Sequence, residues 1–157
     1  MSVLMAIALA AAAPADSDLL ELATPQQIVA AMQQAGYRAD LKKENGVPLI
    51  DSAANGSPFV LYLYDCETGK CSGLDFQAMY RPDPFYTAEL ANEWNSSNRF
   101  LKISVNPKGE LREWVHYSVV GKVTRANFKN AIAWFTEMDV KLTRFLEAKR
   151  AAATEAP

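Results

Sequence analysis

The sequence predicts an α+β fold in which helices cover one face of an antiparallel β-sheet, in the order α-β-β-β-β-α-β-β-α. Apolar residues recur at helical spacing near both ends of the 157-residue chain and once in between. Segments with a period of two fill the remainder, and short turns such as Asn45-Gly46 join them, which implies antiparallel pairing. The length fits one domain, which we expect over residues 24–148.

The first predicted helix has clear start and stop signals. Thr24 is a good N-cap, Pro25 suits the first helical position, and Gln27 completes a capping box. Gly36 then stands where a helix commonly ends. The apolar positions of this helix share one face: Ile28, Ala31, Met32 and Ala35.

Four strands are expected next, separated by Asn-Gly turns and by the loop that holds the cysteines. The third segment, "FVLYLYD", is apolar on both faces and is therefore expected at the centre of the sheet. Two prolines in "RPDP", residues 81–84, end the run because proline lacks a backbone N–H donor. The predicted strands cover residues 37–42, 47–53, 59–65 and 74–80.

The second half of the chain predicts a short helix, a hairpin and a long helix. In "TAELANEWNSSN" the apolar Leu90 and Trp94 lie one turn apart. The strands "FLKISV" and "ELREWVHYSVV" follow, joined by a turn at "NPKG". Thr124 caps the last helix, and the polar, Ala-rich residues 149–157 predict a flexible tail.

The only two cysteines, Cys66 and Cys71, flank a turn in "YDCETGKCSG". At the ends of two paired strands their Cα atoms would lie about 4.5 Å apart, which a disulfide accepts. A thioredoxin-type pair needs two intervening residues, and a zinc site needs about four ligands, whereas His116 is the only histidine. We therefore predict a structural disulfide and no metal site, with free thiols and a metal or redox role as alternatives.

The first residues, "MSVLMAIALAAAAPADS", are typical of an export signal. The apolar run 3–13 is shorter than the roughly 20 residues that span a bilayer, and Ala13-Pro14-Ala15 has the small-x-small form of a cleavage site. We expect residues 1–15 to be removed, with no membrane anchor left and a periplasmic or secreted location, where disulfides persist. No Lys or Arg precedes the run, so an attached leader, a misassigned start and cleavage after Ala13 remain open.

Charge is unevenly distributed along the chain. Residues 16–98 carry 5 basic and 12 acidic side chains, whereas residues from 99 onward carry 11 basic and 6 acidic ones. We interpret the basic half as a solvated helix face. Nucleic-acid binding would need a basic excess over the whole domain, so we expect no nucleic-acid partner.

No motif in the sequence predicts an active site, so we expect no catalytic residue and no cofactor. His116 shares a strand face with Arg112 and Trp114, and an enzyme that uses His116 with nearby acidic residues is an alternative. A polar and aromatic cluster surrounds the second helix. It either caps and anchors that helix or forms a recognition surface, and its members are Asn92, Trp94, Asn95 and Arg99.

The segment "ELANEWNSSNRF" resembles the signature region of the YbjN domain family. The capped helix ending in "AGY", the Asn-Gly turns, the Cys…Gly-Lys-Cys hairpin of exported members and the long C-terminal helix extend this resemblance over residues 24–146. It implies a fold like that of type III secretion chaperones, small proteins that bind extended peptide segments and often dimerise. Members are described as bacterial sensory-transduction regulators without catalytic residues.

The resemblance therefore implies a non-enzymatic protein that binds a protein or peptide partner in a regulatory or chaperone-like role. A homodimer is compatible with it. A small-molecule sensor module is the alternative outside enzymes.

Overall fold

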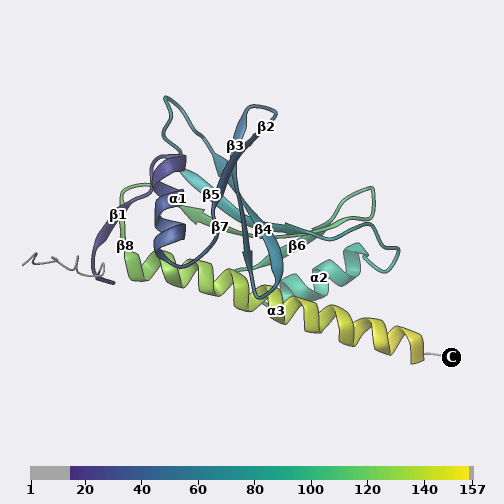
Figure 1. Ribbon diagram of the computed structural model, residues 1–157. Coiled ribbons are helices and arrows are strands. Elements are labelled where there is room, and N and C mark those ends of the chain that lie inside the picture. The colour runs from purple at the N-terminus through teal and green to yellow at the C-terminus, as the bar shows by residue number, and fades with distance from the viewer. Residues whose placement is uncertain (1–14, 156–157) are drawn as a thin grey trace, which may run out of the picture.

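A computed structural model, which describes residues 15–155, has the α+β architecture that the sequence predicts (Figure 1). Within those residues the main sheet has six antiparallel strands in the order β2-β3-β4-β5-β7-β6, so β4 is an inner strand as expected. The strands are β2 (Asp40–Glu44), β3 (Val47–Ala54), β4 (Ser57–Tyr64), β5 (Gly73–Met79), β6 (Lys102–Val105) and β7 (Leu111–Ser118). The helices are α1 (Pro25–Gln34), α2 (Ala88–Ser97) and α3 (Arg125–Glu155).

The predicted export signal falls on residues 1–14, which lie outside the described part, and on Ala15, the first described residue. Among the helices that the structure describes, none is both long and apolar enough to cross a membrane.

A second, two-stranded sheet is a feature that the sequence did not predict. It pairs β1 (Leu19–Glu21) with β8 (Lys122–Thr124), and strands this short leave too few residues for a recognisable alternation. Beside it, the carbonyls of Asp16 and Asp18 accept hydrogen bonds from the N–H groups of Ala126 and Arg125, at 3.0 and 2.8 Å. Residues just after the expected cleavage position thus satisfy two donors at the start of α3.

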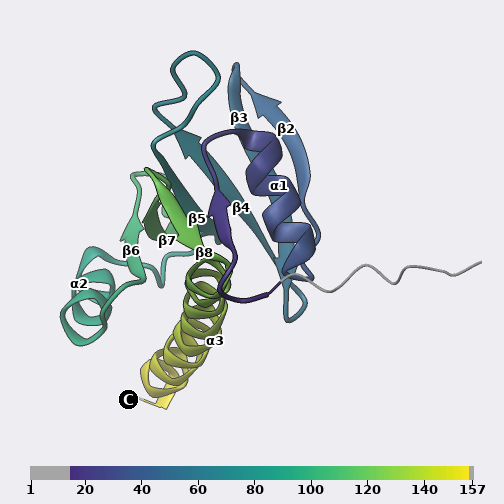
Figure 2. The ribbon, with the colours of Figure 1, turned by 90° about the vertical axis from the view of Figure 1, so that its left-hand side faces the viewer.

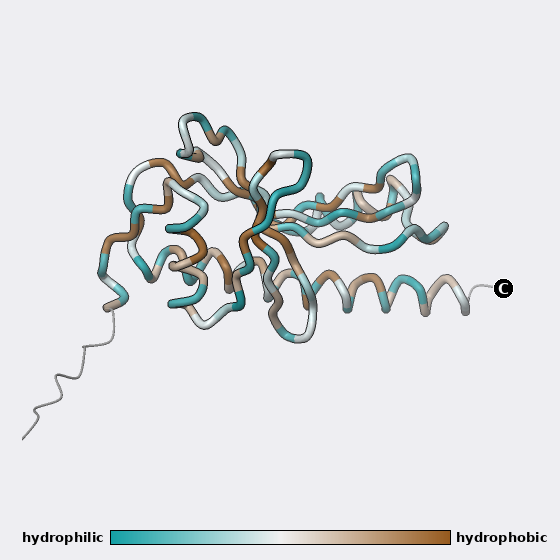
Figure 3. Tube along the Cα trace, turned by 45° about the horizontal axis from the view of Figure 1, so that its top comes forward, coloured by the Kyte–Doolittle hydropathy of each residue, from teal (hydrophilic) through white to brown (hydrophobic). Residues whose placement is uncertain are grey.

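Helices α1 and α3 pack on one face of the main sheet, and α2 lies along the edge formed by β6 (Figure 2). In β4 the residues Phe59, Leu61 and Leu63 are buried against the helices, and the residues between them face the other side. Figure 3 shows the hydrophobic stretches meeting in the middle of the sheet, while the tips of several turns are hydrophilic. The fold is therefore a two-layer sandwich, and the other face of the sheet is covered by no described helix.

Helix α1 begins and ends as predicted. The Thr24 side chain accepts a hydrogen bond from the Gln27 N–H, and the Gln27 side chain accepts one from the Thr24 N–H, which makes a complete capping box. Gly36 follows the helix with φ +91°, in the left-handed region that a Cβ disfavours.

Helix α3 continues further than expected, through Glu155, over most of the predicted flexible tail at 149–157. Contacts to α2 and to the loop before it hold the first residues of this extension. Lys149 pairs with Glu93, and Arg150 pairs with Asp83 at 2.6 Å while its guanidinium lies 4.3 Å from the ring centre of Phe85. Propensity alone does not predict these tertiary contacts.

The core contains a pair of carboxyl groups, Glu113 on β7 and Asp139 on α3. The side chain of Glu113 is 0% exposed, and neither of its oxygens has a hydrogen-bond partner among the described residues, whereas Asp139 accepts from the Tyr80 hydroxyl at 3.3 Å. Burial, followed by the nearby Asp139 charge, raises the pKa of Glu113 to about 9. Glu113 is therefore a neutral acid at pH 7.

We expect this proton to make stability depend on pH. The pKa of Glu113 is higher in the folded chain than its ordinary value of 4.5, so the folded state binds the proton more tightly, and the stabilisation is lost as pH rises from about 4.5 to about 9. Within that window the free energy of unfolding should fall by about 1.4 kcal/mol per pH unit. Urea unfolding across the window measures it.

Glu113→Gln is the matched control, because a neutral amide of similar shape has no proton to lose there. Its stability should change less with pH and exceed that of the wild-type protein at the alkaline end. A constant difference between the two curves would contradict the assignment.

Candidate functional site

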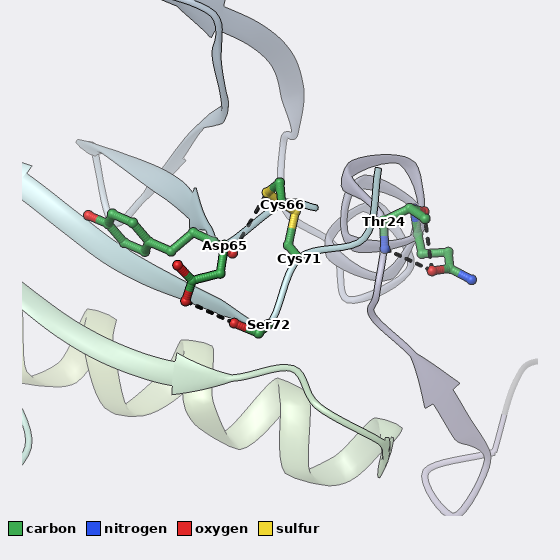
Figure 4. Close-up of a disulfide and its surroundings, with 7 residues drawn as sticks. Thr24, Asp65, Cys66, Cys71 and Ser72 are labelled. Carbon is green, nitrogen blue, oxygen red and sulfur yellow. Dashed lines mark hydrogen bonds between the residues drawn. A yellow bond between two sulfur atoms is a disulfide. The ribbon is translucent and has the colours of Figure 1, made fainter. Parts of the chain in front are cut away.

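Cys66 and Cys71 form the predicted disulfide, but they do not lie at paired strand ends (Figure 4). The pairing of β4 with β5 ends at Tyr64 and Gly73, and an isolated antiparallel bridge joins Glu67 to Lys70 further out. Both cysteines therefore belong to the loop beyond the strands, with their Cα atoms 3.8 Å apart. Asp65, with φ +49°, turns the chain out of the strand before the first cysteine. This left-handed turn is the reason why strand geometry gave the wrong placement.

The disulfide loop packs against the start of α1, beside Thr24 in Figure 4. The Cys71 N–H donates to the carbonyl of Ala23 at 2.7 Å, and the Cys71 side chain is buried. The disulfide therefore closes a loop whose Cys71 backbone is bonded to the residue before Thr24, and it is compatible with an oxidising compartment.

His116 lies on the open sheet face, together with Arg112 and Trp114 as predicted. Its Nδ1 is 2.7 Å from Oδ1 of Asp75, and the Arg112 guanidinium lies 4.6 Å from the ring centre of Trp114. Asp75 is on the neighbouring strand β5, and only the strand register identifies it as the partner. Among the described residues, no hydrogen bond joins His116 to a hydroxyl or thiol, so the structure supplies a base and an orienting acid but no positioned nucleophile.

The cluster around α2 divides into two structural and two exposed residues. Trp94 is 1% exposed, and its Nε1–H donates to the carbonyl of Leu101 at 3.1 Å. Asn95 donates to the carbonyl of Ile103 at 2.8 Å and accepts from the Ile103 N–H at 3.0 Å. Asn92 and Arg99 are exposed, so within this cluster the expected recognition role remains a prediction for these two side chains.

The carboxamide of Asn95 acts as a substitute strand on the outer edge of β6. It satisfies both backbone groups of Ile103 that point away from β7, and α2 packs against β6. Lys102 adds to the attachment, because its Nζ donates to the carbonyls of Asn95 and Asn98 at 2.9 Å each, at the end of α2.

The opposite edge of the sheet, β2, is protected by charge. All five of its residues are exposed, and four of them are ionic: Asp40, Lys42, Lys43 and Glu44. Charged side chains along an edge strand disfavour pairing with another chain.

One stretch of edge has neither kind of protection. The pairing of β6 with β7 ends at Lys102, opposite Trp114, whereas β7 continues to Ser118. The chain turns away from β7 at Phe100, whose φ of +67° is unusual for a bulky residue. Residues 115–118 are therefore paired with β5 on one side and with no described strand on the other.

Alternation along the strands identifies the backbone groups at this edge. The backbone N–H and C=O groups of Ile103 face Asn95, so those of its neighbours in β6 face β7. The backbone groups of the paired residues Trp114 and Arg112 therefore face β6. At the two ends of β7, the Leu111 carbonyl accepts a hydrogen bond from the Tyr80 N–H, and the Val119 N–H donates one to the Ser72 carbonyl. Both bonds are on the β5 side of the sheet. By the same alternation, the N–H and C=O groups of His116 and Ser118 point outward from the open edge.

A groove lies between this edge and α3. Two exposed aromatic residues form its wall, Phe100 at 54% and Trp134 at 39% exposure, with their ring centres 4.7 Å apart. The cavity has a volume of about 330 Å³. We call it the edge groove, and its main lining residues are Phe100, Val115, Tyr117, Asn127, Ala131 and Trp134.

Sequence reasoning missed the edge groove, because it depends on where one strand stops relative to its neighbour. One signal was present in the sequence. Trp134 is a large aromatic residue that stands outside the apolar positions of α3, beside the buried Phe135.

We expect Asn95→Ala to lower the free energy of unfolding by about 1–3 kcal/mol, because the buried backbone groups of Ile103 lose their partners. Asn92→Ala, on the exposed face of the same helix, is the control and should change stability by less than about 0.5 kcal/mol. Chemical denaturation of both variants measures the difference. Equal losses would show that Asn95 has no special role at the strand edge.

Comparison with known protein families gives one match. A family model matches residues 24–142, and the family is described as "Putative bacterial sensory transduction regulator". No curated protein matches the chain. Because the match covers most of the sequence and the observed fold, this chain belongs to the YbjN family.

Proposed function

We propose that this YbjN-family protein is an exported, non-enzymatic protein that binds an extended segment of a partner protein. The segment adds as a strand to the open edge of β7. One observation carries the proposal: in the part of the chain that the structure describes, residues 115–118 are a stretch of sheet edge with no strand paired to it, and they include no Lys, Arg, Asp or Glu.

Strand addition uses groups that the edge already presents. Backbone N–H and C=O groups of His116 and Ser118 would bond the incoming segment, which supplies affinity without regard to sequence. Alternate side chains of that segment would point into the edge groove, where Phe100 and Trp134 offer aromatic surface. Apolar residues at every second position are therefore the expected preference.

Two further observations support this reading. The family description is that of a regulator, and regulators commonly act by binding other proteins. The disulfide between Cys66 and Cys71 fits an oxidising compartment, which agrees with the export signal expected in the sequence.

Selection from a displayed library of random ten-residue peptides tests the proposal, with affinities of the selected peptides measured by fluorescence anisotropy. Ser118→Pro should weaken their binding about tenfold, because proline removes one outward N–H donor and leaves the bonds to β5 intact. Trp134→Ala should weaken binding to a similar extent through loss of the groove wall.

Ser118→Ala is the matched control, because it removes the same hydroxyl but keeps the N–H, and its affinity should equal that of the wild-type protein. Thermal unfolding shows that each variant is folded. Enrichment of no peptide, or equal affinity of the folded Ser118→Pro and Ser118→Ala variants, would refute strand addition at this edge.

A further inference from the structure

A second cavity lies on the other side of the Phe100–Trp134 ring pair. Its volume is about 230 Å³, and it shares these two rings with the edge groove. Two cations line it, Arg99 and Lys141. We call it the basic hollow, and its lining residues are Ser97, Asn98, Arg99, Phe100, Trp134, Met138 and Lys141.

We infer that the segment bound at β7 carries a carboxylate on its C-terminal side, which the basic hollow receives. This inference rests on the proposed function and specifies the partner's chemistry. The carboxylate is either an acidic side chain or the terminal carboxylate of the partner.

The charges in the hollow are not matched within the chain. Neither Arg99 nor Lys141 has a carboxylate within ion-pair distance among the described residues, and no acidic residue lines the hollow. Three of the other nine cations from residue 99 onward have a carboxylate partner among the described residues. They are Lys129 with Asp16, Lys149 with Glu93, and Arg150 with Asp83.

The direction of the added strand places its C-terminal side at the hollow. Antiparallel pairing is the more stable arrangement, and a segment antiparallel to β7 runs in the same direction as β6, from beside Ser118 towards Phe100. There the turn at Phe100 blocks a straight continuation along β6, and the basic hollow lies next to that residue.

The dimensions suit a short segment. At about 1.5 Å per residue, α3 is roughly 21 Å long from Asn127 in the edge groove to Lys141 in the basic hollow. An extended chain covers that length in about six residues. A partner segment of about six residues therefore reaches from the open edge to both cations.

A second copy of this chain fits the hollow less well than such a segment does. The β7 strand of another copy, added antiparallel, continues after Ser118 as Val119-Val120-Gly121-Lys122. Its first charged residue is a lysine, which Arg99 and Lys141 would repel. Charge complementarity thus favours a carboxylate-bearing partner over self-association at this edge.

Synthetic versions of the selected peptides test the inference in three forms: with a free C-terminal carboxylate, with a C-terminal amide, and with internal Asp or Glu replaced by Asn or Gln. Removal of the carboxylate should weaken binding about tenfold. Rising salt should reduce the difference in affinity between the peptides with and without the carboxylate. Which form loses affinity identifies the source of the carboxylate.

The double variant Arg99→Glu with Lys141→Glu should bind the carboxylate peptide at least about tenfold more weakly. A matching peptide with lysine in place of the carboxylate should regain affinity for this variant. Lys43→Glu with Lys108→Glu, a double reversal at exposed sites away from the groove, is the control and should leave affinity unchanged.

Equal affinity of the acid and amide forms, together with an unaffected Arg99→Glu and Lys141→Glu variant, would overturn the inference. The proposed function would still stand if Ser118→Pro weakened binding. If instead the charge reversal weakened binding and Ser118→Pro did not, the carboxylate site would stand without strand addition.

Discussion

The paired hydrogen bonds between Asn95 and Ile103 determine where the main sheet ends. They anchor α2 on the outer side of β6, and the chain that connects α2 to β6 then turns at Phe100 instead of continuing beside β7. β6 is consequently shorter than β7, and the last residues of β7 keep an unpaired edge. Both the edge groove and the basic hollow are consequences of this one arrangement.

The rest of the molecule makes that edge rigid. β7 is an inner strand along its first half, and α3 crosses it on the core side, where Phe128 and Phe135 are buried. The neutral Glu113 lies under the same helix. A partner that adds a strand would therefore meet a preformed template, and little ordering entropy would oppose binding.

Much of the fold could be predicted from the sequence, because local signals are strong in this chain. The capping box at Thr24, the Asn-Gly turns and the inner position of β4 each agree with the structure. The cysteines were predicted at paired strand ends, and the left-handed turn at Asp65 places them instead in the loop beyond β4 and β5, next to the isolated bridge between Glu67 and Lys70.

The candidate site could not be predicted in the same way. It requires the register of β6 against β7, the side-chain bonds of Asn95, and the contact of Phe100 with Trp134, all of which join residues distant in sequence. Local periodicity does not contain such information. The sequence did single out Trp94 and Asn95, and the structure uses both to build the edge of the sheet beside the groove.

Amide hydrogen exchange of the unbound protein, measured residue by residue by NMR, tests the account most directly. We expect alternation along the end of β7: slow exchange at Val115 and Tyr117, whose N–H groups face β5, and fast exchange at His116 and Ser118, whose N–H groups face outward. Uniformly slow exchange over these four residues would mean that another chain or segment covers the edge. The open-edge account would then be wrong.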